Sequence, residues 1–145
     1  MGLDAQSAQA VKDSFSKVMA AYSAGKIEEA MSYTTSDDDI VLIEPGPHQI
    51  WVGRDKVRQG IQFDWDTTEG EMPIEITNIW VAGEGDAAWV NGETKINIRY
   101  KGKDVDLTGR FTAVAKRQGG AWKWHTIHIG ASDPRHTEGE AWPEV

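Results

Sequence analysis

Residues 86–100, "DAAWVNGETKINIRY", carry the clearest pattern in the chain. The second half of this stretch alternates two sets of side chains: Thr94, Ile96, Ile98 and Tyr100 against Lys95, Asn97 and Arg99. A period of two is typical of a β-strand with one covered face and one exposed face. The stretch therefore predicts a long strand of an antiparallel sheet.

Three neighbouring segments repeat this period and extend the sheet. They are "IEITNIWVA" at 74–82, "DVDLTGRFTAVAK" at 104–116 and "AWKWHTIHIGA" at 121–131. Glycine-rich turns separate the four strands, namely "GEGD", "KGK" and "RQGG". Two shorter strands precede them, in "DIVLIEP" at 39–45 and "QIWV" at 49–52, so we expect about six strands.

The first half of the chain has helical periodicity instead. A single apolar stripe predicts a helix over Ala5–Ser23, and it consists of Val11, Phe15, Val18, Met19 and Tyr22. Gly25 is expected to end this helix as its left-handed cap residue. A short helix follows around residues 27–31, and a third begins at Gly53. Helices at one end of an antiparallel sheet indicate an α+β domain. We expect a curved sheet that three N-terminal helices close into a cone with an internal pocket.

Composition and length favour one compact domain. The chain has 145 residues, of which 39% are hydrophobic and 26% are charged. We expect a single domain over residues 1–132. The acidic, proline-broken remainder, residues 133–145, is expected to be a C-terminal tail.

Charge and cysteine content exclude several classes of function. A net charge of −8 argues against binding to nucleic acid or to an anionic membrane, because both need a basic face. The absence of cysteine excludes disulfides, thiolate catalysis and zinc–sulfur sites. No apolar run reaches the roughly 20 residues of a membrane span, and no signal-peptide pattern is present, so we expect a cytoplasmic protein.

The two histidines of "WKWHTIHIGAS", residues 122–132, raise the question of a metal site. Residues three apart on a strand point to opposite faces, so His125 and His128 cannot share one metal unless a bulge lies between them. We therefore predict no metal site and no cofactor. The same period groups His125 with Ile127 and Ile129, and His128 with Trp122 and Trp124. Both faces are apolar, so we expect a homodimer through the outer face of the sheet.

Three motifs resemble one known group of proteins. They are "IEPG" at 43–46, "GRDKVRQGIQFDW" at 53–65 and "GAWKWHTIHIGAS" at 120–132. Their order and spacing resemble the SnoaL-like domain of the nuclear transport factor two-like superfamily. That superfamily includes ketosteroid isomerase, scytalone dehydratase and the association domain of calcium/calmodulin-dependent kinase II. The resemblance spans roughly residues 8 to 132 and implies the cone-shaped fold, also called cystatin-like.

The resemblance also suggests site residues. In ketosteroid isomerase the acidic residue before a proline at the end of the first strand is the general base, and Glu44 matches it. The oxyanion donors of that enzyme fall at Val18 and Thr112, which cannot replace them, so its steroid chemistry is not expected. In the kinase association domain Trp65 matches a pocket-edge tryptophan, but the pocket arginines fall at Asn91, Thr112 and Ile129. A carboxylate-binding pocket is not implied either.

The candidate site residues follow from these arguments. His125 could carry a proton or donate a hydrogen bond in the pocket, or it could simply be a core or interface residue. Arg110 could bind an anion of the ligand or form a salt bridge with Glu44 or Asp106. The expected catalytic residues are Glu44, His125 and Arg110. The expected ligand-binding residues are Trp51, Trp65, Thr112, Ile129, Tyr22 and Phe63.

The sequence leaves two classes of function open, and a third is less favoured. The first is a pocket that binds a small, mainly apolar ligand without chemistry. The second is a cofactor-free isomerase, lyase or hydrolase with Glu44 as its base. The third is a structural dimerisation module.

Overall fold

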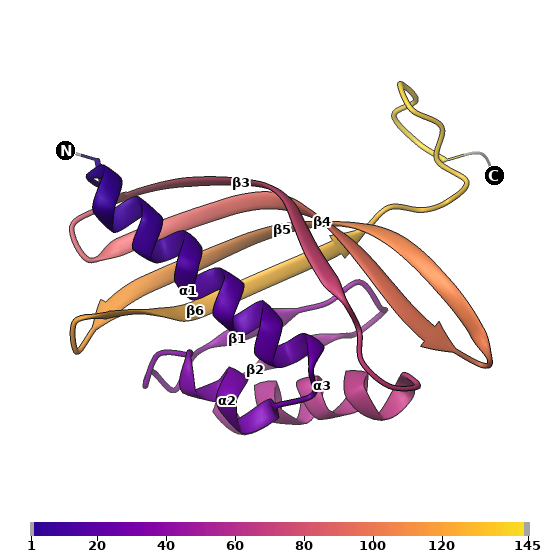
Figure 1. The fold of residues 1–145 in the computed structure, drawn as a ribbon, viewed down its shortest axis with the longest axis horizontal. Helices are drawn as coiled ribbons and strands as arrows, with labels where there is room; N and C mark the ends of the chain where they lie inside the picture. The colour runs from indigo at the N-terminus through magenta and orange to yellow at the C-terminus, as the bar shows by residue number, and fades with distance from the viewer. Residues whose placement is uncertain (1, 144–145) are drawn as a thin grey trace.

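The computed structural model describes residues 2–143, and it is an α+β structure with one six-stranded curved sheet (Figure 1). Residues 144 and 145 of the predicted tail and residue 1 lie outside the described part. The elements in chain order are α1 (Ala5–Ser23), α2 (Ile27–Ser32), β1 (Val41–Ile43), β2 (Ile50–Val52), α3 (Arg54–Thr67), β3 (Ile74–Glu84), β4 (Ala87–Tyr100), β5 (Lys103–Gln118) and β6 (Ala121–Ala131).

Helix α1 has the predicted bounds, and its ends have clear causes. The Asp4 side chain accepts a 2.7 Å hydrogen bond from the Ser7 backbone N–H, which caps the first turn. After the last turn Gly25 adopts a φ of +70°, a conformation that glycine adopts without strain. The Trp65 ring packs so closely on Gly25 that a Cβ there would lie 2.4 Å from it. This contact holds the end of α1 against α3.

The strand order is β2-β1-β6-β5-β4-β3. All neighbours are antiparallel except β1 and β6, which pair in parallel with Leu42 opposite Ile127. The prediction of a purely antiparallel sheet is therefore wrong at this one pairing. Periodicity identifies a strand, but it contains no information about which strand lies beside it.

A bulge in β6 changes which of its side chains face the helices. Val114 pairs with Thr126, but the next residue, Ala115, pairs with Trp124, so His125 is the extra residue. Trp122 and Trp124 are therefore buried on the same side as Ile127. The predicted grouping of the two tryptophans with His128 is wrong, because it assumed an unbroken period of two, whereas His125, Ile127 and Ile129 line one cavity together as predicted.

The core lies between α1 and the sheet. Phe15 is fully buried and stacks on Phe111 of β5 at 4.4 Å between ring centroids. Its other neighbour is Trp124, which meets it edge-on at 5.0 Å. The indole N–H of Trp124 donates to the Ser14 hydroxyl, so its only polar atom is satisfied within the core. In Figure 1, α1 crosses one face of the sheet while α3 lies beside β1 and β2.

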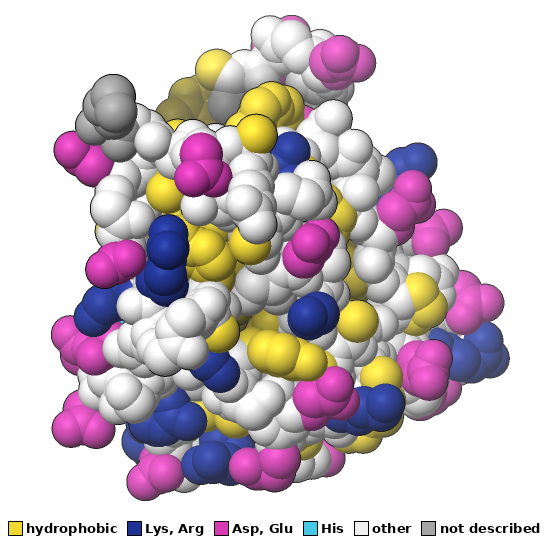
Figure 2. Space-filling model, turned by 60° about the vertical axis from the view of Figure 1, so that its left-hand side comes forward, with side chains coloured by type: hydrophobic (Ala, Val, Ile, Leu, Met, Phe, Trp, Pro, Cys, Tyr) yellow, Lys and Arg dark blue, Asp and Glu magenta, His cyan; other side chains and the backbone are white. Residues whose placement is uncertain are grey.

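The surface carries mixed charge. On the face drawn in Figure 2, lysine and arginine side chains are interspersed with aspartate and glutamate around separate hydrophobic groups. Such mixing gives that face no broad field of one sign. No helix within residues 2–143 is long and apolar enough to cross a membrane. Residues 133–143 contain no helix or strand and follow the end of β6.

Candidate functional site

Glu44 lies at the end of β1 and is only 8% exposed. Its backbone N–H donates to the Gln49 carbonyl across the β1–β2 turn, which aims the side chain inward. From β2, the indole N–H of Trp51 donates to Glu44 Oε2 at 2.8 Å. Gly60 of α3 lets this indole approach closely, since a Cβ on Gly60 would lie 2.6 Å from the ring. Trp51 is therefore a direct partner of the carboxyl group.

A second acidic side chain stands next to Glu44. Asp64 of α3 accepts a 2.6 Å hydrogen bond from the Tyr22 hydroxyl of α1, and it also hydrogen-bonds the Glu44 carboxyl. Glu44, Asp64, Tyr22 and Trp51 thus form one polar cluster, which we call the Glu44 cluster. Four different elements contribute to it, and their meeting point is where α1 and α3 approach the end of β1.

The surroundings of Glu44 determine its protonation. Burial raises the pKa of Glu44 to about 9, and the hydrogen bond and negative charge of Asp64 add to the rise. Burial also raises the pKa of Tyr22 well above its ordinary value, with the charge of Asp64 as the next cause. At neutral pH Glu44 therefore holds its proton. A protonated carboxyl is a proton donor, whereas the resemblance implies a base at this position.

Two cavities meet at the Glu44 cluster. The outer one, of about 180 Å³, is partly open and runs between α3 and the bent ends of β3, β4 and β5. Its walls are mostly apolar, with Ile74, Ile96 and Leu107 facing Glu44 and Asp64. The inner one, of about 40 Å³, is lined almost wholly by apolar side chains and has room for only a few water molecules. Tyr22, Glu44 and Ile129 line both cavities.

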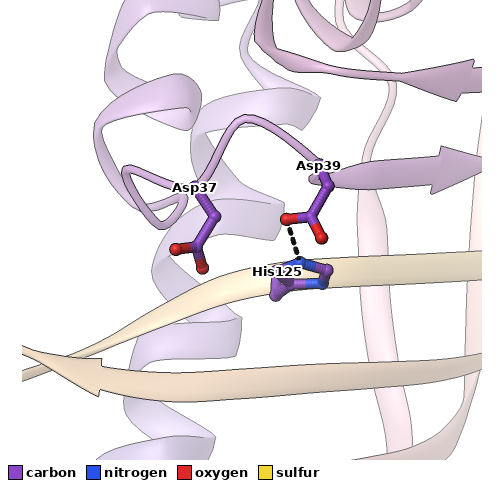
Figure 3. Close-up of side chains that lie close together, drawn as sticks. All are labelled: Asp37, Asp39 and His125. Carbon is purple, nitrogen blue, oxygen red and sulfur yellow. Dashed lines mark hydrogen bonds and ion pairs between the residues drawn. The ribbon is translucent and has the colours of Figure 1, made fainter.

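His125 lies at the opposite end of the inner cavity. Its Nε2 atom is 2.9 Å from Asp39 Oδ1 (Figure 3). Its Nδ1 atom is 2.8 Å from the Thr126 hydroxyl. Ile43 pairs with His128, which places Glu44 beside Ile129, four residues along β6 from His125. At 3.3 Å per residue, and with one of these four residues taken up by the bulge, the two side chains start roughly 10 to 13 Å apart along the strand. Both line the inner cavity, whose volume of about 40 Å³ leaves room for only a few water molecules between them.

Two of the predicted site residues face away from both cavities. Arg110 and Thr112 are exposed on the outer face of β5, and the Thr112 hydroxyl donates to the Asn91 side chain there. The buried face of β5 carries Phe111 and Ala113. Thr112, an expected ligand-binding residue, therefore lines neither cavity, and Arg110 lies on the opposite face of the sheet from Glu44. The polarity of these two side chains is enough to predict their position on the outer face. Burying the charged Arg110 side chain without a partner would cost free energy.

The other predicted ligand-binding residues divide between positions in the cavities, positions between helices and positions on the surface. Tyr22 and Ile129 line both cavities. Trp65 packs on Gly25 and lines neither cavity, so the role that the resemblance implies for it is not met by its position. Phe63 is 50% exposed on α3, with its ring 6.5 Å from that of Trp51.

Asp64 is the site residue that the sequence analysis missed. A signal for it exists, because Val57, Ile61 and Asp64 fall at i, i+4 and i+7 on α3. The first two are buried, so an acidic residue on the same stripe has to lie at a covered position. An ionisable residue on the apolar stripe of a helix needs a partner, and Tyr22 supplies it.

Comparison with solved structures identifies the fold. A candidate dehydratase of the nuclear transport factor two-like family from Streptomyces avermitilis superposes with a TM-score of 0.76 at 20% identity, over 86% of this chain and 95% of that one. A ketosteroid isomerase-like protein from Erwinia carotovora atroseptica gives 0.77 at 19% identity, over 90% and 100%. A candidate calcium/calmodulin-dependent protein kinase II association domain from Xanthomonas campestris gives 0.71 at 20% identity, over 83% and 84%.

These identities are low and speak for the fold alone. Among proteins with curated descriptions, none matches the chain. The sequence itself matches the SnoaL-like domain over residues 11–134, which covers all of the elements from the middle of α1 to the end of β6. The chain therefore belongs to the SnoaL-like domain family.

Proposed function

We propose that this protein binds a small, mainly apolar organic molecule in the cone of its curved sheet, and transfers a proton to it as an isomerase or lyase. One observation carries the proposal: the buried Glu44 carboxyl and the Asp64 carboxyl lie together at the wall of a mostly apolar cavity. Two carboxyl groups that share one site, with the proton held on one of them, are typical of acid–base catalysis. The dehydratase description of the Streptomyces avermitilis neighbour is in keeping with a lyase.

The cluster can perform both halves of such a reaction. Asp64 would accept a proton from carbon, while Glu44 would donate its proton to an oxygen of the ligand. In an isomerisation that oxygen is a carbonyl that becomes an enol; the enol O–H proton then returns to Glu44 while Asp64 delivers its proton to a different carbon, so that the double bond has moved. In a dehydration it is a hydroxyl whose C–O bond breaks, so that water leaves and a double bond forms. Tyr22 orients Asp64, and Trp51 orients Glu44.

The cavity limits the size of the ligand. Its volume of about 180 Å³ is smaller than the roughly 300–1,000 Å³ of pockets for drug-sized molecules. A single ring or a short chain with one oxygen function fits that space. Isoleucine and leucine walls would bury its apolar part next to the two carboxyl groups.

Substituting each carboxyl tests the proposal. A thermal-shift screen of small cyclic ketones and hydroxy compounds first identifies ligands, since binding raises the unfolding temperature. With a ligand that is turned over, we expect Glu44→Gln and Asp64→Asn each to lower kcat by at least about a hundredfold while binding persists. His125→Asn tests the alternative proton carrier, and His128→Asn is the control, because His128 is exposed on the outer face of the sheet.

Two outcomes would contradict the proton transfer. Ligands that bind wild type but show no proton exchange, elimination or isomerisation would support a pocket without chemistry. Unchanged kcat in Glu44→Gln, with a large loss in His125→Asn, would move the chemistry to the histidine. If none of the screened compounds binds, the ligand half of the proposal fails as well.

We also propose that the outer face of the sheet forms a homodimer. Trp80 of β3 is 58% exposed and Trp89 of β4 is 45% exposed. Ala82 pairs with Trp89, which places the two indoles as diagonal neighbours on one face. Two exposed tryptophans side by side are unusual on a surface that meets only water.

The oligomeric state tests this surface. We expect the wild type to elute as a dimer by size-exclusion chromatography with light scattering, and the double variant Trp80→Ser/Trp89→Ser to elute as a monomer. Trp142→Ser is the matched control, since Trp142 is 83% exposed in the tail. A monomeric wild type, or a double variant that remains a dimer, would rule this interface out.

A further inference from the structure

We propose that Asp37, Asp39 and His125 form a binding site for a divalent transition metal of the zinc class, at the end of the inner cavity away from Glu44. One ligand atom from each of these side chains lies within 4.8 Å of the other two (Figure 3). Two segments 86 residues apart build the site, the loop before β1 and the bulge of β6. This proposal does not depend on the proton-transfer chemistry of the Glu44 cluster.

The imidazole is held in the orientation that a metal ligand needs. The His125 side chain is 22% exposed, and its Nδ1 atom contacts the Thr126 hydroxyl at 2.8 Å. Because Nδ1 is engaged, Nε2 is the nitrogen that faces the two carboxylates. A second hydrogen bond that fixes ring orientation is a regular feature of histidines that bind metals. The bulge is what turns the ring toward the loop.

The two carboxylates can close around an ion at little cost. Ligand atoms in a tetrahedral zinc site lie roughly 3.4 Å apart, which follows from metal–ligand distances of 2.0–2.2 Å. Asp39 is 80% exposed, so its side chain can rotate by the small distance required. The Asp37 side chain is 27% exposed and lies on the same side of the His125 ring as Asp39 (Figure 3).

Lys116 is the resident cation that a metal would displace. Its ammonium lies 2.8 Å from Asp37 Oδ2, and the lysine side chain is 45% exposed. A partly exposed ion pair of this kind contributes little to stability, so the lysine can swing into solvent. The ion pair therefore competes with the metal for one carboxylate oxygen and weakens binding without preventing it.

The donor set selects the class of metal. One imidazole nitrogen with two carboxylate oxygens suits zinc and its neighbours, which accept three protein ligands plus water. Calcium needs six to eight oxygen ligands, and these three residues supply too few. His128 is exposed on the outer face and takes no part, as the spacing of the two histidines predicts.

Metal titration of tag-free protein tests the site directly, without any assay of activity. We expect one equivalent of Zn²⁺ by calorimetry, and a visible absorption band with Co²⁺. His125→Ala and Asp39→Asn should each weaken Zn²⁺ binding at least about tenfold. Asp39 is exposed, so its substitution leaves the fold intact. Lys116→Gln should tighten binding by about two- to fivefold.

The matched controls are His128→Ala and His136→Ala, two exposed histidines outside the cluster. Both should bind Zn²⁺ as the wild type does. The proposal is overturned if wild type and Lys116→Gln both fail to bind one equivalent, or if His125→Ala binds as well as wild type. Loss of binding in His136→Ala would place the ion in the tail instead and would also overturn it.

Discussion

Glu44→Gln should become steadily more stable than the wild type as the pH rises. In the folded protein burial and Asp64 raise the pKa of Glu44 to about 9, compared with 4.5 for the free side chain. At a pH between these two pKa values, the Glu44 carboxyl ionises in the unfolded chain but stays protonated in the folded protein. Stability from this group is thus complete below pH 4.5 and is lost as the pH rises toward 9. From pH 4.5 to 7 the loss is on the order of 3 kcal/mol.

Glutamine removes this dependence and keeps the shape. Its side-chain oxygen can still accept from the Trp51 indole, and its amide can donate to Asp64. The groups that face this position are Asp64, Tyr22 and Trp51, and all are unchanged in the variant. Urea unfolding at several pH values measures the difference between the two proteins. The exposed Glu138→Gln is the control and should show no such trend. A difference that is constant with pH would mean that Glu44 ionises in the folded state.

Phe15→Ala should destabilise the protein by about 3–5 kcal/mol. Phe15 is completely buried, and its ring stacks on Phe111 and meets Trp124 edge-on. Removing the ring leaves a cavity between α1 and the sheet that rigid neighbours cannot fill. Because α1 also carries Tyr22, the variant should lose ligand binding in the outer cavity before it unfolds globally.

Phe63→Ala makes the same chemical change at a surface position. Phe63 is 50% exposed, so we expect a loss below about 1 kcal/mol. Equilibrium denaturation of both variants against wild type measures the contrast. Equal losses would show that the ring of Phe15 does not organise the core as its contacts indicate.

Local patterns in the chain were enough to predict its elements. The stripe of α1 and the alternation in β4 appear in the structure where periodicity places them. Such a prediction succeeds because the polarity of a side chain in a helix or strand depends mainly on whether its face of that element contacts water or the protein core. Glu44 was likewise placed at a pocket wall from the proline that ends its strand and from the family resemblance.

Contacts between distant elements decided the rest. The extra residue at His125 places Trp124 on the inner face of the sheet. The alternation of side chains along a strand does not show where such a bulge lies. The parallel pairing of β1 with β6 and the packing of α3 brought Asp64 onto Glu44. That contact adds to the rise in the pKa of Glu44 that burial causes, because the pKa of a carboxyl depends on burial and on charges that arrive from elsewhere in the chain.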